Sequence, residues 1–148
     1  MLNSILKFKI MKTFFYTMAI CFFVSTAAFA QKKIEMVCTS PSGETAKYKV
    51  DSFTYTIFDR DSTATVAQFY VSLKKNPDKF ILQWKSKPSN LANGSVKLQN
   101  ATTGKTEQII DFKSAKITAL TGTLEMGYST LNIEAKELII DGVKMELK

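Results

Sequence analysis

The chain has 148 residues, which is enough for one domain with a hydrophobic core and too few to expect two. It carries 20 basic and 13 acidic residues and no histidine, so the commonest general base and metal ligand of proteins is missing. Only two cysteines are present, and one of them falls in the N-terminal leader described next, which excludes a disulfide-stapled scaffold.

The first thirty residues have the pattern of a cleavable signal peptide. A basic start is followed by the apolar run Thr13–Thr26 and by the small-residue cleavage site Ala28-Phe29-Ala30, just before Gln31. The run is shorter than the about 20 residues of a membrane span. We expect residues 1–30 to be removed and residues 31–148 to form one domain that is periplasmic or secreted. Contact with the membrane is then expected only through the leader before cleavage.

Charge in the remaining chain indicates solubility rather than a nucleic-acid partner. Three lysines leave with the leader, so the remaining chain has 17 basic and 13 acidic residues and a net charge of +4. Sixteen of the 17 are lysines, and Arg60 is the single arginine, whereas nucleic-acid sites favour clustered arginine with aromatic residues. We expect no nucleic-acid binding.

Cys38 is the one cysteine of the predicted mature domain. It lies between Val37 and Thr39 in an apolar run, which predicts a buried small hydrophobe. An intermolecular disulfide is the alternative.

The first half of the domain alternates apolar and polar residues as strands do. Ile34–Thr39 is the first predicted strand. In Lys47–Phe58 the apolar positions change from even to odd numbers near Asp51, which predicts a β-bulge there. The polar segment Phe58–Thr65 is predicted to be a loop before the strand Val66–Leu73.

One helix is predicted, over Pro77–Ser86. Asn76 is the expected N-cap and Pro77 the first helical residue. Phe80 and Trp84 are four residues apart and so share a face. We interpret Trp84 as a packing anchor between helix and sheet, with stacking on a ligand as the alternative.

Further strands follow at close spacing. Asn93-Gly94 predicts a turn, and Ala101–Gly104 predicts a hairpin loop between Ser95–Asn100 and Lys105–Phe112. Two short strands, Ala115–Leu120 and Thr123–Met126, are expected next. The spacing predicts a mainly β fold, a small antiparallel barrel or two packed sheets, with one flanking helix.

The C-terminal segment predicts the corner that closes this fold. Leu131, Ile133 and Ala135 alternate with polar residues. Asp141-Gly142 is a strong two-residue hairpin signal, which pairs Leu138 with Met145 and Ile140 with Val143. The inward face must then switch parity near Lys136-Glu137, through a bulge or a bend from one sheet to the other.

No constellation of reactive residues emerges from the sequence. Asp59 and Asp61 form an acidic pair but lack the further ligands of a calcium loop. Nothing brings Asp78 and Glu107 together as acid and base, and the serines have no neighbouring base. We therefore predict no catalytic, metal or cofactor-binding residue and no enzyme.

The order of motifs resembles Hcp (TssD), the tube protein of bacterial type VI secretion. The first part of the match is SFTYTI at Ser52–Ile57, followed by Val66–Leu73 and the tryptophan-bearing helix. The second part is GSVKLQN at Gly94–Asn100, EQIIDFKSAKI at Glu107–Ile117 and STLNIEAKELII at Ser129–Ile140. The resemblance covers Thr45–Leu147.

This resemblance implies a β-barrel whose copies assemble into hexameric rings that stack into a tube, with secretion-apparatus components or effectors as partners. The leading hypothesis is a self-associating structural protein, a tube subunit or an exported relative of one. The alternative is a monomeric periplasmic binding module. Its barrel interior would hold a small apolar ligand among Phe53, Tyr55, Phe69, Ile110 and Phe112.

Overall fold

A computed structural model describes residues 31–61, 64–123, 125–145 and 147. The predicted leader lies outside the described residues. The strands are β1 (Lys32–Thr39), β2 (Thr45–Asp61), β3 (Ala64–Leu73), β4 (Ala92–Asn100), β5 (Thr106–Thr123), β6 (Tyr128–Ala135), β7 (Glu137–Ile140) and β8 (Val143–Met145). Helix α2 (Lys79–Ser86) lies between β3 and β4. The mainly β prediction with one helix is confirmed, and the described part contains no helix long and apolar enough to cross a membrane.

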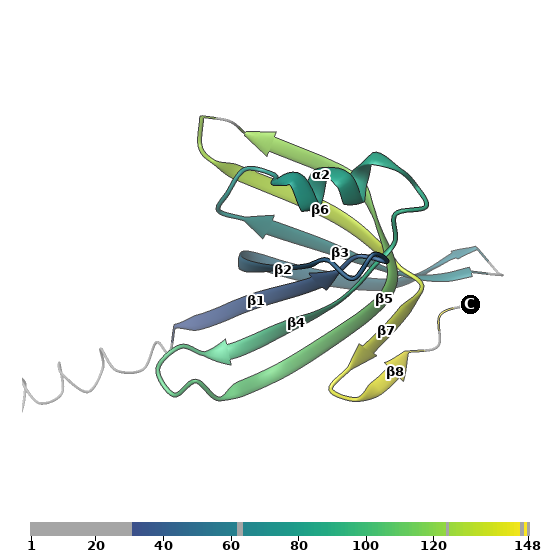
Figure 1. Cartoon of the computed structure of the whole chain (residues 1–148). Coiled ribbons are helices and arrows are strands. Elements are labelled where there is room, and N and C mark those ends of the chain that lie inside the picture. Colours follow the sequence, from purple (N-terminus) through teal and green to yellow (C-terminus); the bar gives the residue numbers. More distant parts are fainter. Residues whose placement is uncertain (1–30, 62–63, 124, 146, 148) are drawn as a thin grey trace, which may run out of the picture. The chain divides into compact units, whose positions relative to one another are not determined.

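The strands form a ring of antiparallel neighbours. Their order is β4-β1-β2-β3-β6-β5-β7-β8, and β4 also pairs with β5, which joins the two ends of the first six strands. Strand β5 is long enough to pair with two different strands along the same side. Its first half pairs with β7 and its second half with β6 (Figure 1). The hairpin of β7 and β8 therefore extends from the ring.

The predicted bulge in β2 is confirmed. The register with β3 shifts between Val50 and Ser52, which leaves Asp51 as the extra residue. Tyr48, an even-numbered position, is buried before the bulge, and the odd-numbered Phe53 packs against the core after it.

The loop predicted over Phe58–Thr65 is wrong. Strand β2 continues to Asp61 and β3 begins at Ala64, so most of the segment lies in the strand ladder. Cross-strand partners explain how such a polar sequence stays extended. The Thr65 hydroxyl donates to the Asp59 carboxylate at 2.6 Å, directly across the pair.

Strand β5 is continuous across the two separate strands predicted over Lys105–Phe112 and Ala115–Leu120. It runs through Gly122 to Thr123, so the separate strand over Thr123–Met126 is wrong. Its inward face changes from the even-numbered Phe112 to the odd-numbered Ala115. Ser114 has a φ of 49°, and this left-handed residue makes the change of parity without ending the strand.

The turn predicted at Asn93-Gly94 is also wrong, because both residues lie inside β4. Glycine is needed here for close approach. A Cβ atom at Gly94 would lie 2.6 Å from the carbonyl oxygen of Val37 and against the ring of Phe112. The hairpin between β4 and β5 is confirmed around Ala101–Gly104.

The terminal hairpin is confirmed in its turn and its register. Asp141 and Gly142 have φ values of 49° and 84°, as a type I′ turn requires, and Leu138 faces Met145. The inward face switches between the buried Ala135 and Leu138, as predicted. The register with β5 does not slip across this switch, so β6 and β7 bend together with β5.

Helix α2 begins later than predicted. Asp78, not Asn76, is the N-cap, and its carboxylate accepts the backbone N–H of Ile81 at 3.1 Å. Pro77 therefore precedes the helix. Asp78 takes the N-cap position because its carboxylate also binds partners outside the helix, which are described below. The predicted inward face is confirmed, since Phe80 and Trp84 are buried.

The core fills the inside of the ring and the space under α2. The largest side chains with almost no exposure are Tyr48, Phe69, Phe112, Met36, Leu73, Ile81, Leu131, Ile133 and Leu138. Cys38 is fully buried among them, and burial raises the pKa of its thiol to about 12. The structure thus favours the buried hydrophobe over the intermolecular disulfide.

We expect Gly94→Ala to destabilise the fold. The added methyl group must displace the Val37 carbonyl or the Phe112 ring, and overpacking of this kind lowers the free energy of unfolding by about 1–3 kcal/mol. Urea unfolding measures the difference. Gly122→Ala is the matched control, since its Cβ would meet Pro77 at an ordinary 3.6 Å. Equal losses in both variants would contradict this explanation.

Candidate functional site

Asp59, Asp78 and Glu107 each have a different partner in the structure, and the side chain of Asp61 lies outside the described residues. Asp59 is occupied by Thr65, Asp78 binds Lys75, and Glu107 pairs with Lys32 at 3.2 Å. Across residues 31–61, 64–123, 125–145 and 147, no group of three or more acidic or cysteine side chains is arranged to hold a metal ion.

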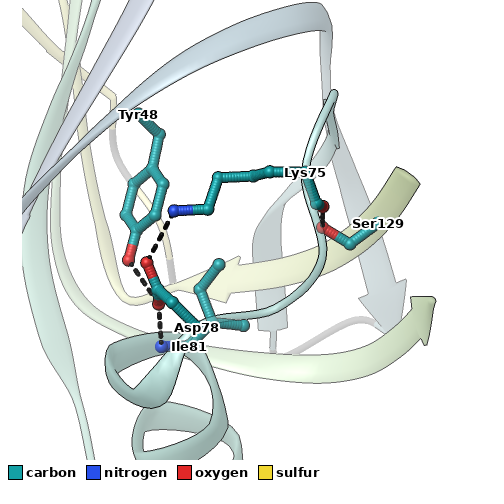
Figure 2. A network of polar contacts seen from close by, with 5 residues as sticks. All are labelled: Tyr48, Lys75, Asp78, Ile81 and Ser129. Carbon is teal, nitrogen blue, oxygen red and sulfur yellow. Dashed lines mark hydrogen bonds and ion pairs between the residues drawn. The ribbon is translucent and has the colours of Figure 1, made fainter. Parts of the chain in front are cut away.

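A polar network attaches the start of α2 to the barrel. Asp78 accepts hydrogen bonds from the Tyr48 hydroxyl at 3.0 Å, the Lys75 ammonium at 2.8 Å and the backbone N–H of Ile81 (Figure 2). The Lys75 ammonium also lies 5.0 Å from the centre of the Tyr48 ring. The Ser129 hydroxyl donates to the Lys75 carbonyl at 2.8 Å, which connects the network to β6.

The pKa values indicate a structural network. Burial alone would raise the pKa of Asp78, but the hydrogen bonds from Lys75, Ile81 and Tyr48 lower it below its ordinary value. Burial and the charge of Asp78 raise the pKa of Tyr48. At neutral pH the carboxylate is charged and the phenol is neutral, so neither is poised to exchange a proton.

Helix α2 covers an edge of the sheet. Beyond Ala115, strand β5 has β6 on one side and no paired strand of the described part on the other. The Trp84 indole N–H donates to the Ala115 carbonyl at 2.9 Å, and Lys85 donates to the carbonyls of Ile117 and Thr118 at 3.2 and 2.8 Å. Trp84 is thus the predicted packing anchor, and α2 satisfies carbonyls that an edge would otherwise expose.

A hollow of about 440 Å³ lies between α2 and the turn after β1. Phe80 and Trp84 line it together with Ser40, Glu44 and Asn90. Its volume suits a small molecule, but the fold already uses two of the polar groups that line it. The indole N–H binds Ala115, and the Ser40 hydroxyl accepts the backbone N–H of Glu44 at 3.1 Å.

Three of the five side chains proposed to hold an apolar ligand instead pack together in the core. Phe69, Ile110 and Phe112 are buried, and the rings of Phe69 and Phe112 are 5.5 Å apart. Phe53 and Tyr55 line, with Ile110, an open hollow of about 100 Å³. This volume is well below the about 300 Å³ of the smallest typical ligand sites.

More of the exposed large apolar side chains lie on one two-stranded ribbon than on any other element of the described part. We define the β2–β3 ribbon as Ser52–Asp61 of β2 with Ala64–Ser72 of β3; its tip projects at the right of Figure 1. Seven large apolar side chains are exposed in the described part, and four lie on this ribbon: Tyr55, Ile57, Phe58 and Tyr70, at 36–48 % exposure. Tyr55 and Ile57 lie on one face of the ribbon, and Phe58 and Tyr70 lie on the other.

The ribbon is held in place on one side only. Arg60 donates to Glu134 of β6 at 2.7 Å, and Lys116 of β5 pairs with the same carboxylate at 3.1 Å. Burial alone would raise the pKa of Glu134, but Arg60 and Lys116 lower it. The opposite edge is free within the described part, because β1 pairs only with Thr45–Val50.

Sequence reasoning missed this ribbon because it assigned the ribbon's tip to a loop. The alternation of Phe53, Tyr55 and Ile57 predicts a strand, but it also suggests that these side chains point into the barrel interior. Alternation cannot tell a strand inside the ring from one that projects beyond it, since both have period 2.

This arrangement resembles solved structures of Hcp1 proteins. Hcp1 from Flavobacterium johnsoniae matches with a TM-score of 0.59 at 17% identity, over 75% of this chain and 98% of that chain. A double mutant of the Hcp1 protein from E. coli EAEC 042 matches with a TM-score of 0.60 at 6% identity, over 78% of this chain and 97% of that chain. No protein-family model and no curated protein sequence matches. The chain therefore has an Hcp-like fold.

We expect Asp78→Ala to loosen α2. The variant loses the N-cap and the partner of Lys75, so its free energy of unfolding at pH 7 should fall by about 1–2 kcal/mol. Because the pKa of Asp78 is lowered in the fold, its contribution is fully present above the ordinary pKa of 3.8 and is lost as the pH falls through the lower folded value.

Urea unfolding of both proteins at pH 7 and below pH 3.8 checks this prediction, and the difference between them should shrink at the acidic pH. Tyr48→Phe removes one of the three donors to Asp78 and is the milder control. A difference that does not depend on pH would show that the carboxylate charge contributes nothing.

Proposed function

We propose that the protein is a non-enzymatic structural protein that self-associates as a type VI tube subunit, or as an exported relative of one. The observation that carries the proposal is the likeness to Hcp1 structures, which spans nearly the whole of those chains. Copies of the protein would form a hexameric ring, with secretion-apparatus components or effectors as further partners.

The β2–β3 ribbon supports self-association. Phe58 and Tyr70, which are exposed on the same face of the ribbon, would lie against a neighbouring copy. Aromatic residues are enriched at protein interfaces because they bury much area at a small loss of side-chain entropy. Contacts that repeat head-to-tail generate a ring when the rotation between copies closes.

Export is part of the proposal. The leader over residues 1–30 would direct the protein to the periplasm or out of the cell, where the domain starting at Gln31 would act. Sequencing the N-terminus of the protein recovered outside the cytoplasm tests this step. An N-terminus at Gln31 is expected, and retention of the leader would overturn it.

Assembly should depend on the ribbon. The purified protein is expected to form ring-shaped oligomers, visible by negative-stain electron microscopy and measurable by light scattering. Phe58→Asp with Tyr70→Asp should abolish them, because an interface would bury two new unpaired charges.

The matched control is Leu82→Asp, which places the same charge on a side chain that is 52 % exposed on α2, away from the ribbon. Rings should survive this change. A wild-type protein that stays monomeric at high concentration would overturn the proposed function.

A further inference from the structure

The free edge of β2 is unprotected in a way that edge strands rarely are. Pairing with β1 ends at Val50 and the bulge follows at Asp51, so the edge is open from Ser52 onward within the described part. Proteins usually guard such edges with lysine, proline or a covering element. The β5 edge is covered by α2, but Ser52–Phe58 (SFTYTIF) has no charge, no proline and no glycine.

The same seven residues are complementary to themselves. If two copies of Ser52–Phe58 align antiparallel about Tyr55, Phe53 of each copy faces Ile57 of the other on the inner side of the ribbon. Thr54 faces Thr56 on the outer side. Aromatic–β-branched and threonine–threonine pairs are the cross-strand pairs that stabilise sheets.

Shifting the two strands to a neighbouring register would place a charged residue opposite an apolar one. Inner and outer faces must match, so the register can shift only in steps that keep odd positions opposite odd ones. Centring on Thr56 would place Phe53 opposite the charged Asp59. Centring on Thr54 would place Ile57 opposite Asp51, which lies in the bulge and pairs with Lys74 at 2.7 Å. In the register about Tyr55 no charged residue falls between Ser52 and Phe58, and Asp51 faces Asp59 of the other copy only beyond each end of this segment.

We infer that two copies of the protein pair through the Ser52–Phe58 edges of β2, antiparallel and centred on Tyr55, to form a closed two-fold dimer. The inference rests on the self-association proposed above and goes beyond it. A ring repeats one contact head-to-tail, whereas this contact is the same on both copies and stops at two. A ribbon paired in this way has its edge occupied by the second copy.

Disulfide trapping tests the register directly. In the proposed pair the two Tyr55 residues are opposite each other, with Cα atoms about 4.5–5.5 Å apart, which a disulfide can bridge. Tyr55→Cys should therefore form a covalent dimer under mild copper–phenanthroline oxidation. Tyr70→Cys is the matched control, at least as exposed but on β3, so two β2 strands would separate the two thiols by about 14 Å.

Tyr55→Cys should cross-link at least roughly ten times faster than Tyr70→Cys, since only its thiols are within bonding distance. The native Cys38 is fully buried and should not contribute. Equal rates, or no dimer with Tyr55→Cys, would overturn the inference.

A charge swap gives a second test, measured by sedimentation equilibrium. In T54K/T56K each new lysine faces a lysine of the other copy, so the dimer dissociation constant should rise roughly tenfold. In T54K/T56E the lysine at position 54 faces the glutamate at position 56, and affinity should return towards the wild-type value. Failure of this rescue would overturn the register. Q68K changes the cross-strand partner of Thr56 on β3, away from the edge, and should leave dimerisation unchanged.

The inference and the proposed function fail in different ways. Rings without Tyr55→Cys cross-links would overturn the edge pairing and leave the tube function standing. Cross-linked dimers without rings at any concentration would support the edge pairing and overturn the ring. Circular dichroism checks that each variant folds, and where T54K/T56K does not fold the cross-linking result decides.

Discussion

The fold depends on one line of bends across neighbouring strands. Strand β5 passes through a left-handed residue at Ser114, whose backbone N–H donates to the Asn93 side chain of β4 at 2.9 Å. On its other side, the Lys136 N–H between β6 and β7 donates to the Lys113 carbonyl at 3.2 Å. Because the strands bend at the same level, the sheet can close into a ring while its ladder continues.

Packing explains why this corner needs its particular residues. The Phe112 ring lies over Gly94 of the adjacent strand, where a side chain would collide with it and with the Val37 carbonyl. The Phe112 ring also packs against the Phe69 ring of β3, with 5.5 Å between the ring centroids. The corner thus directs one large aromatic side chain into the centre of the barrel, and the core is built around it.

Two strands, β5 and β2, extend beyond the part that closes the ring, and the structure handles the two extensions differently. The far half of β5 is covered by α2 through Trp84 and Lys85, and the Asp78 network holds that helix against Tyr48. The far half of β2 projects as a ribbon with exposed aromatic residues and an open edge in the described part. The closed ring supplies rigidity, and the open edge of β2 offers backbone groups to which a further strand could add.

Local sequence patterns determined the presence of most strands but not all of their ends, together with the bulge at Asp51, the inward face of α2 and the Asp141-Gly142 turn. Each of these features depends on residues close together in the chain. Tertiary structure decided the rest. It extended β2 through polar residues that find partners across the ribbon, kept β5 whole through Ser114, and placed Gly94 under Phe112 rather than in a turn. It also left Tyr55 and Ile57 outside the core, since alternation marks two faces of a strand but not what will cover them.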